Sequence, residues 1–169
     1  MDGTGDTVET FRPDGRAPSL RDVDLAPLAA GGLRGIILDL DNTSCAYGRP
    51  ELAEGVADWV QGARAAGFAV VLLSNNFTGR VAAAGATLGI PGVSSALKPL
   101  PFGFLRALRL LGTARAETVV IGDQLLTDVL GAKLLGLHAI LTEPLTPRDF
   151  ALTRLLRLLE RRLFRRIPS

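Results

Sequence analysis

Short apolar runs alternate along the chain with segments whose apolar residues recur at helical spacing. The apolar runs, each short enough for a strand buried on both faces, cover residues 33–40, 68–73, 118–121 and 138–141. The helical segments between them cover residues 51–66, 78–88, 102–111 and 125–135. This alternation predicts an α/β protein with a Rossmann-like, three-layer arrangement and a mainly parallel sheet.

The ends of the chain differ in composition from its centre. We expect a disordered, acidic and Gly-rich tail at 1–14, one folded domain at 15–147 and a basic helix at 148–169. No apolar run approaches the roughly 20 residues that a membrane-spanning helix needs. The start of the chain also lacks the basic and then apolar pattern of a signal peptide. These features predict a cytoplasmic protein.

The C-terminal segment 149–166 is amphipathic. Its leucines (152, 155, 156, 159 and 163) share one helical face, and arginines 154, 157, 161 and 165 share the opposite one. Between 148 and 166, seven arginines stand against two acids, so this stretch is +5 and the remainder of the chain is −3. Two interpretations stay open: a helix at the anionic inner face of a membrane, or leucines packed on the domain or on a second subunit. The segment lacks the interleaved aromatics and recognisable module of a nucleic-acid binder, so no nucleic-acid partner is expected.

Polar side chains follow several of the predicted strands directly. Because the carboxyl ends of parallel strands share one edge of the sheet, these residues should converge on one crevice, which Lys98 can reach from a loop. They are Asp39, Asp41 and Thr43 after the first run, Ser74 and Asn75 after the second, and Gly122 and Asp123 after the third.

The carboxylates at this edge suit a hard cation. Asp39 and Asp41, with Asp123 and Asp128, would repel one another unless a cation lies between them, and oxygen ligands favour Mg2+. His138 and Cys45 are the only residues of their types, which excludes a cysteine-based zinc cluster. The alternative is that these aspartates only cap turns and helices. A calcium loop fits poorly, because its sixth and twelfth positions hold Ser44 and Pro50.

Ser74 and Lys98 add a hydroxyl and an ammonium group to the predicted crevice. Phosphoryl transfer is accelerated mainly by positioning and by neutralising charge on the equatorial oxygens, which these groups can do beside a magnesium ion. Lys98 is one of two lysines beside seventeen arginines. The alternative for Lys98 is a solvated surface residue.

The motifs occur in a familiar order. D-x-D-x-T from Asp39, then Ser74-Asn75-Asn76, Lys98-Pro99, and G-D-x-x-x-T-D from Gly122 resemble the haloacid dehalogenase superfamily of phosphatases. Within it, the chain is similar to the YqeG-type phosphatases of subclass IIIA, which are related to phosphatidylglycerophosphate phosphatases. The resemblance extends from about Phe11 to the C-terminal segment, and it implies a haloacid dehalogenase-like fold.

The resemblance also implies a role for each motif residue. Asp39 would attack phosphorus and bind Mg2+, and Asp41 would act as acid and base while its backbone carbonyl binds the metal. Thr43 would orient Asp41 and contact the substrate, whose phosphoryl group would be held by Ser74, Asn75 and Lys98. Asp123 would bind the metal, and Asp128 would bind it directly or support a ligand. Ser44-Cys45 depart from the usual apolar residues after the motif threonine, which affects the expected shape of the pocket mouth.

The distances between motifs leave no room for a cap domain. About thirty residues separate Asp41 from Ser74, and fewer separate Ser74 from Lys98. An uncapped site favours a large phosphorylated substrate, such as a lipid head group like that of phosphatidylglycerophosphate. A soluble phosphorylated metabolite is the alternative. From a different class, a non-catalytic receiver-like phosphate-binding module remains, although its acidic pair and lysine would stand in another order along the chain.

Overall fold

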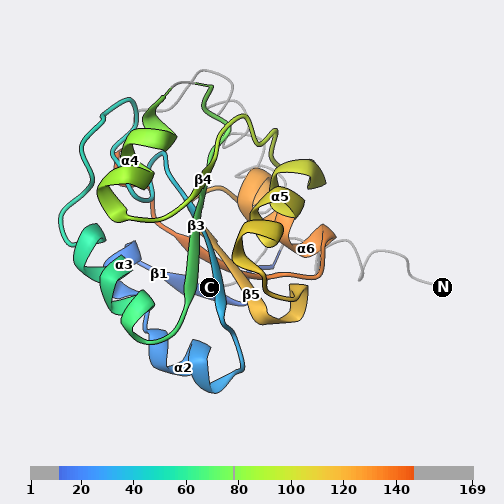
Figure 1. Ribbon diagram of the computed structural model, residues 1–169. Coiled ribbons are helices and arrows are strands. Elements are labelled where there is room, and N and C mark those ends of the chain that lie inside the picture. The colour runs from blue at the N-terminus through green and yellow to red at the C-terminus, as the bar shows by residue number, and fades with distance from the viewer. Residues whose placement is uncertain (1–11, 78, 147–169) are drawn as a thin grey trace.

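The protein is built around one parallel sheet. The computed structural model describes residues 12–77 and 79–146. Every strand pair in the sheet is parallel, and the spatial order is β1-β6-β5-β2-β3-β4 (Figure 1). The strands are β1 (Gly15–Ala17), β2 (Gly35–Asp39), β3 (Ala69–Leu73), β4 (Gly92–Val93), β5 (Thr118–Gly122) and β6 (His138–Thr142). The predicted α/β class is confirmed.

Helices cover both faces of this sheet, with α3 and α4 on one side and α5 and α6 on the other (Figure 1). Successive residues of a strand point to opposite faces. In β2, Ile36 and Leu38 therefore pack in one core cluster and Ile37 in the other, which explains the continuous apolar run. The helical segments are η1 (Leu20–Asp22), α2 (Leu25–Ala30), α3 (Val56–Ala65), α4 (Arg80–Leu88), α5 (Pro101–Leu111), η2 (Arg115–Glu117), η3 (Leu125–Val129) and α6 (Leu130–Leu134).

The centre of the sheet positions the polar residues. β2 lies between β5 and β3, and its last residue, Asp39, is in register with Leu73 at the end of β3. Gly122 at the end of β5 is in register with Leu141 of β6. The motif residues that follow these strands therefore emerge at one edge. Only helices, turns and the short β4 connect the strands in the described ranges, so no cap domain is present there.

Two predicted helices differ from the observed ones. The segment predicted from residue 51 becomes helical only at Val56, because Leu52 forms an antiparallel bridge with Cys45 and Gly55 adopts a left-handed φ of 80°. The segment predicted as one helix from residue 125 begins as the π-helix η3 and continues as α6. Both differences arise where the chain turns near the carboxyl edge of the sheet.

The remaining differences concern the ends of the sheet and of the chain. The strands β1 and β4 and the helix α2 were not predicted. Asp14, which falls within the predicted tail, hydrogen bonds through its backbone N–H to the carbonyl of Ala139 at 2.8 Å. The predicted C-terminal helix at 148–169 lies outside the described residues. Within the described ranges, no helix has the length and apolar character needed to cross a membrane.

Candidate active site

Three aspartates meet at the carboxyl edge of the sheet. Asp39 is the last residue of β2, Asp123 follows β5, and Asp128 lies in η3. One carboxylate oxygen from each lies within 4.8 Å of the other two, and all three residues are buried. The convergence of these three predicted residues brings together the acidic groups that could hold a cation.

Lys98 lies within this group of aspartates. Its ammonium donates to Asp39 Oδ1 at 2.5 Å, to Asp128 Oδ1 at 2.6 Å and to the carbonyl of Leu73 at 3.3 Å. Burial alone would lower the pKa of Lys98, but the charges of Asp128 and Asp39 outweigh it and raise that pKa above its ordinary value. Lys98 is therefore a buried, charged residue and not a solvated surface lysine.

The charge of the cluster is not balanced by Lys98 alone. With all three carboxylates ionised, their −3 and the +1 of Lys98 leave −2 in a buried space. Burial, followed by the charges of Asp128 and Asp123, raises the pKa of Asp39 well above its ordinary value, against the opposing effect of Lys98. Asp39 Oδ2 is buried and has no hydrogen-bond partner among residues 12–77 and 79–146. An orphaned carboxylate oxygen in a pocket of residual charge −2 fits a hard divalent cation.

The position of Asp128 depends on a π-helical turn and a glycine. In η3 the backbone N–H groups of Asp128 and Val129 both donate to the carbonyl of Gln124, at 2.9 and 3.2 Å. The Gln124 N–H donates to Asp128 Oδ2 at 3.1 Å. A Cβ on Gly122 would lie 2.4 Å from Asp128 Cγ, so the absence of a side chain at Gly122 permits this approach. The wide π turn thus brings Asp128 against the end of β5.

Asp41 is not part of the three-aspartate cluster. Its Oδ1 forms an ion pair with Arg80 Nη1 at 2.5 Å, and its Oδ2 accepts a hydrogen bond from Ser74 Oγ at 3.2 Å. Arg80, at the start of α4, also donates from Nη2 to the carbonyl of Arg49 at 2.5 Å. Sequence reasoning missed Arg80, because one arginine among seventeen carries no signal of its own. The acid and base role predicted for Asp41 stays a prediction.

The loop after β2 turns sharply at Asn42. Asn42 has a left-handed φ of 64°, a conformation that asparagine tolerates better than most residues. Its Oδ1 accepts hydrogen bonds from the backbone N–H of Tyr47 at 3.3 Å and from Thr146 Oγ1 at 2.8 Å. Asparagine's tolerance of this φ was the one available signal, and the sequence reasoning did not use it. The turn separates the side chains of Asp39 and Asp41.

The three residues after Asn42 all face inward. Thr43 is buried, and its hydroxyl has no hydrogen-bond partner among the described residues, so its predicted role in orienting Asp41 stays a prediction. Ser44 Oγ donates to the carbonyl of Asp39 at 2.6 Å. Cys45 packs in the core cluster beneath α3 and α4. Ser44 and Cys45 therefore support the end of β2 and do not line the pocket mouth.

Asn75 holds the lysine loop. Its side chain accepts a hydrogen bond from the Lys98 backbone N–H at 2.6 Å and donates to the Lys98 carbonyl at 3.2 Å. This two-point contact fixes the backbone from which the Lys98 side chain reaches Asp39. The carboxamide is occupied by the loop in this arrangement, and the substrate contact predicted for Asn75 stays a prediction.

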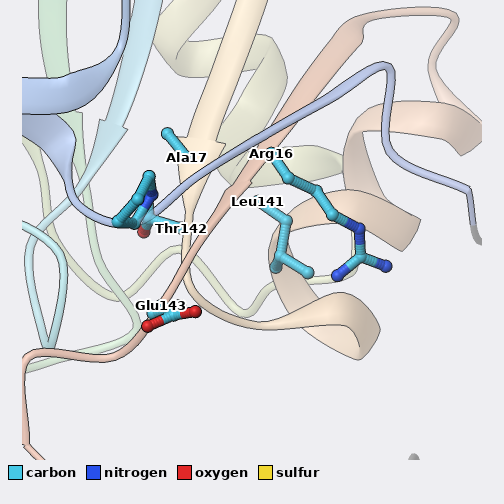
Figure 2. A pocket seen from close by; sticks show the side chains of 6 residues that line it. Arg16, Ala17, Leu141, Thr142 and Glu143 are labelled. Atoms are coloured by element: carbon cyan, nitrogen blue, oxygen red, sulfur yellow. The ribbon is translucent and has the colours of Figure 1, made fainter. Parts of the chain in front are cut away.

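A separate hollow of about 280 Å³ lies at the ends of β1 and β6 (Figure 2). It is lined by Arg16, Ala17, Pro18, Leu141, Thr142 and Glu143. Its two charged residues have opposite signs, and none of the clustered aspartates lines it. The hollow therefore is not the acidic site, although it opens at the same edge of the sheet.

Comparison with known proteins agrees with this geometry. The family model described as haloacid dehalogenase-like hydrolase matches residues 27–136, which include β2 to α6 and all the motif residues. A curated relative, the "Probable phosphatase YqeG" of Bacillus subtilis (strain 168), is 38% identical over 153 residues, which cover 90% of this chain and 89% of the relative. The predicted resemblance to YqeG-type phosphatases is confirmed.

Two further proteins mark the breadth of the similarity. "Phosphatidylglycerophosphate phosphatase 1, chloroplastic" of Chlamydomonas reinhardtii is 32% identical over 142 residues, 77% of this chain and 52%, about half, of that relative. The crystal structure of an uncharacterized protein from Listeria monocytogenes serotype 4b superposes with a TM-score of 0.57 at 20% identity, over 70% of this chain and 85% of that one, and supports the fold alone. The chain belongs to the haloacid dehalogenase-like hydrolase family, and it is a phosphatase of that family.

Proposed function

We propose that the protein hydrolyses a phosphomonoester with the help of Mg2+ and that Asp39 is the nucleophile. The observation that carries this proposal is the buried Oδ2 of Asp39, which has no partner in the described part of the chain, beside three carboxylates and one ammonium that sum to −2 when all are ionised. Asp39, Asp123 and Asp128 supply the side-chain oxygens for the metal, and the Asp41 carbonyl is assigned to it by family resemblance. The bound ion would supply charge neutralisation at the transferring phosphoryl group.

In this proposal Asp39 accepts the phosphoryl group and Asp41 transfers the protons. An Asp39 oxygen attacks phosphorus and forms an aspartyl phosphate, while the bond to the leaving oxygen breaks and that oxygen takes a proton from Asp41. Asp41, then ionised, removes a proton from a water molecule that attacks phosphorus and releases phosphate, which regenerates Asp39. Ser74, which hydrogen bonds to Asp41, would donate a hydrogen bond to a phosphoryl oxygen, and the ammonium of Lys98, which contacts Asp39, would neutralise phosphoryl charge.

We assign a lipid phosphate as the substrate, of the class named for the Chlamydomonas reinhardtii relative. The absence of a cap in the described ranges supports a substrate too large to be enclosed. A soluble phosphorylated metabolite is the second candidate, because the acidic cluster would recognise the phosphoryl group of either. The part of the substrate beyond the phosphoryl group distinguishes a lipid phosphate from a soluble metabolite.

The test is phosphate release from a panel of substrates with Mg2+ or with a chelator. The panel contains phosphatidylglycerophosphate in mixed micelles, glycerol phosphate, sugar phosphates, nucleotides and p-nitrophenyl phosphate. We expect hydrolysis that requires Mg2+, with the lipid turned over fastest, and its loss in Asp39→Asn. Appreciable activity of Asp39→Asn would contradict the covalent mechanism, and preference for a soluble phosphate would contradict the lipid assignment.

Metal binding is measured separately from turnover. Because a ligand that binds only the folded state stabilises it, Mg2+ at about 100 times its Kd should add about 2.7 kcal/mol to the free energy of unfolding. The melting temperature should therefore rise with Mg2+ concentration in the wild-type protein and much less in Asp123→Asn. Equal shifts in the two proteins would show that the ion binds elsewhere.

A further inference from the structure

Arg80 forms two contacts that join the loop after β2 to the start of α4. Its Nη1 donates to Asp41 Oδ1 at 2.5 Å, and its Nη2 donates to the carbonyl of Arg49 at 2.5 Å. The side chains of Arg80 and Asp41 are only 17% and 16% exposed. Because a guanidinium is planar, it presents its donors in a fixed fork and can hold two acceptors in one geometry. One oxygen of Asp41 is therefore held by a rigid donor from a neighbouring helix.

The backbone that carries the Arg80 side chain is itself packed. Arg80 is the first residue of α4, and the next residue, Val81, is buried. A Cβ on Gly92 would lie 2.5 Å from Val81 Cγ1, so the start of α4 packs closely against β4. Close packing of this kind leaves little freedom for the helix to move. Arg80 therefore reaches Asp41 from a fixed point on the sheet.

The two oxygens of Asp41 differ in how firmly they are held. Oδ1 is in the ion pair with Arg80, whereas Oδ2 accepts a single hydrogen bond from Ser74 Oγ at 3.2 Å. Ser74 Oγ also accepts from the backbone N–H of Asn76 at 3.0 Å, which keeps the oxygen in place while its hydrogen can rotate. In the proposed function Ser74 turns this hydrogen to a phosphoryl oxygen. Substrate binding would then free Oδ2 while Oδ1 stays on Arg80.

We propose that Arg80 is a positioning residue that holds Asp41 in place for proton transfer through Oδ2. This inference rests on the proposed function and deepens it. Oδ2 gives its proton to the leaving oxygen as the bond from phosphorus to that oxygen breaks, and later takes a proton from the water that attacks the aspartyl phosphate. Without Arg80 the carboxylate can rotate away from the leaving oxygen. A direct substrate contact by Arg80 fits less well, because its Nη1 and Nη2 both have acceptors within the protein.

The test compares two substrates that differ in their need for a proton donor. The alkoxide that leaves from glycerol phosphate must be protonated as it departs, whereas the nitrophenolate that leaves from p-nitrophenyl phosphate is stable without a proton. Values of kcat/KM are compared, because they report the steps up to the aspartyl phosphate and exclude its later hydrolysis, which both substrates share. The variants are Arg80→Met and, as the matched control, Arg109→Met, which removes an exposed arginine from the last turn of α5.

We expect Arg80→Met to lower kcat/KM about 10- to 100-fold for glycerol phosphate, since a small misplacement of a catalytic group costs rates of this order. For p-nitrophenyl phosphate the loss should be about threefold or less, because Asp41 is not needed as the acid in that step. Arg109→Met should change neither value. The ratio of the two values does not depend on the fraction of folded protein, so a purely structural defect would lower both equally.

Equal losses with the two substrates in Arg80→Met, or no loss, would overturn the proposal. A higher KM for glycerol phosphate with an unchanged kcat would also overturn it, because Arg80 would then be a substrate contact. Arg80→Lys should recover only part of the loss, since lysine keeps the charge but lacks the fork that spans Asp41 and the Arg49 carbonyl. Absence of Mg2+-dependent hydrolysis of both substrates by the wild type would refute the proposed function, and the role of Arg80 with it.

Discussion

Asp39 and Asp41 stand two residues apart in the sequence, yet their carboxylates lie in different electrostatic settings. Asp39 is buried beside Asp123, Asp128 and the ammonium of Lys98. Asp41 is partly exposed and contacts Arg80 and Ser74. The strand ends at Asp39 and the chain turns at Asn42, so the two side chains face different surroundings. The difference shows how one strand end can supply one carboxylate to a buried acidic cluster and another to a partly exposed ion pair.

The largest expected effect comes from replacing the cationic partner of each carboxylate, which is Lys98 for Asp39 and Arg80 for Asp41. Lys98→Met leaves Asp39 and Asp128 buried without their ammonium partner, which should lower the free energy of unfolding by about 3–5 kcal/mol. Arg80→Met leaves Asp41, whose side chain is 16% exposed, with its hydrogen bond from Ser74, so its cost should be smaller, about 1–2 kcal/mol. Urea unfolding followed by circular dichroism, in buffer with a chelator, measures both values.

Two controls keep this comparison interpretable. The chelator removes divalent cations that could replace Lys98, and adding Mg2+ should recover part of the stability lost in Lys98→Met. Lys133→Met removes the other lysine, whose 2.6 Å ion pair with Asp14 is partly exposed (21% for Lys133 and 41% for Asp14), and it should cost no more than Arg80→Met. Similar costs for Lys98→Met and Arg80→Met would show that the two carboxylates do not differ in the way described.

The second effect tests whether the absence of a side chain at Gly122 is needed to place Asp128 beside Asp39. In Gly122→Ala the new Cβ would meet Asp128 Cγ at 2.4 Å, so Asp128 must move away from Asp39 and Lys98. We expect the Mg2+ concentration for half-maximal activity to rise about 10- to 100-fold, as for loss of a group that supports a metal ligand. Steady-state hydrolysis of p-nitrophenyl phosphate at varied Mg2+ concentration measures this change.

Gly62→Ala is the matched control for this substitution. Gly62 lies in α3, and a Cβ there meets nothing within 4 Å. Alanine in a helix interior is favoured over glycine by roughly 0.5–1 kcal/mol, so this variant should be slightly more stable with unchanged kinetics. An unchanged Mg2+ dependence in Gly122→Ala would indicate that Asp128 is not needed to hold the ion.

The sequence predicted the parts of this site that depend on the sheet. Apolar runs such as the one ending at Asp39 are buried on both faces, and their pattern marks the strand ends that carry Asp39 and Asp123, which Lys98 approaches from a loop. Gly122, which the sequence places directly after the run 118–121, is the point that the side chain of Asp128 approaches. The carboxyl-edge rule for parallel sheets therefore suffices to gather these residues before any side-chain contact is known.

Other features depend on contacts that no local pattern encodes. The strands β1 and β4 have three and two residues, too few for a periodic signal. The ion pair of Arg80 with Asp41 joins residues 39 positions apart. The π-helical turn at 125–129 arises because Gln124 accepts two backbone hydrogen bonds, which helical spacing does not distinguish from an α-helix. Tertiary packing determined each of these features.

The smallest effect concerns the inner side of the loop that separates the two carboxylates. Burial, which outweighs the lowering effect of Arg80, raises the pKa of the Cys45 thiol to about 11. The thiolate is the reactive form, and its fraction at pH 8 falls about tenfold for each unit by which the pKa rises above that of an ordinary cysteine. Alkylation of the native protein by iodoacetamide at pH 8 should therefore be about 100-fold slower than that of the chain unfolded in urea, with mass spectrometry as the measurement. Rapid modification of the native protein would mean that the loop opens readily, and the fixed separation of Asp39 from Asp41 would then lack its structural support.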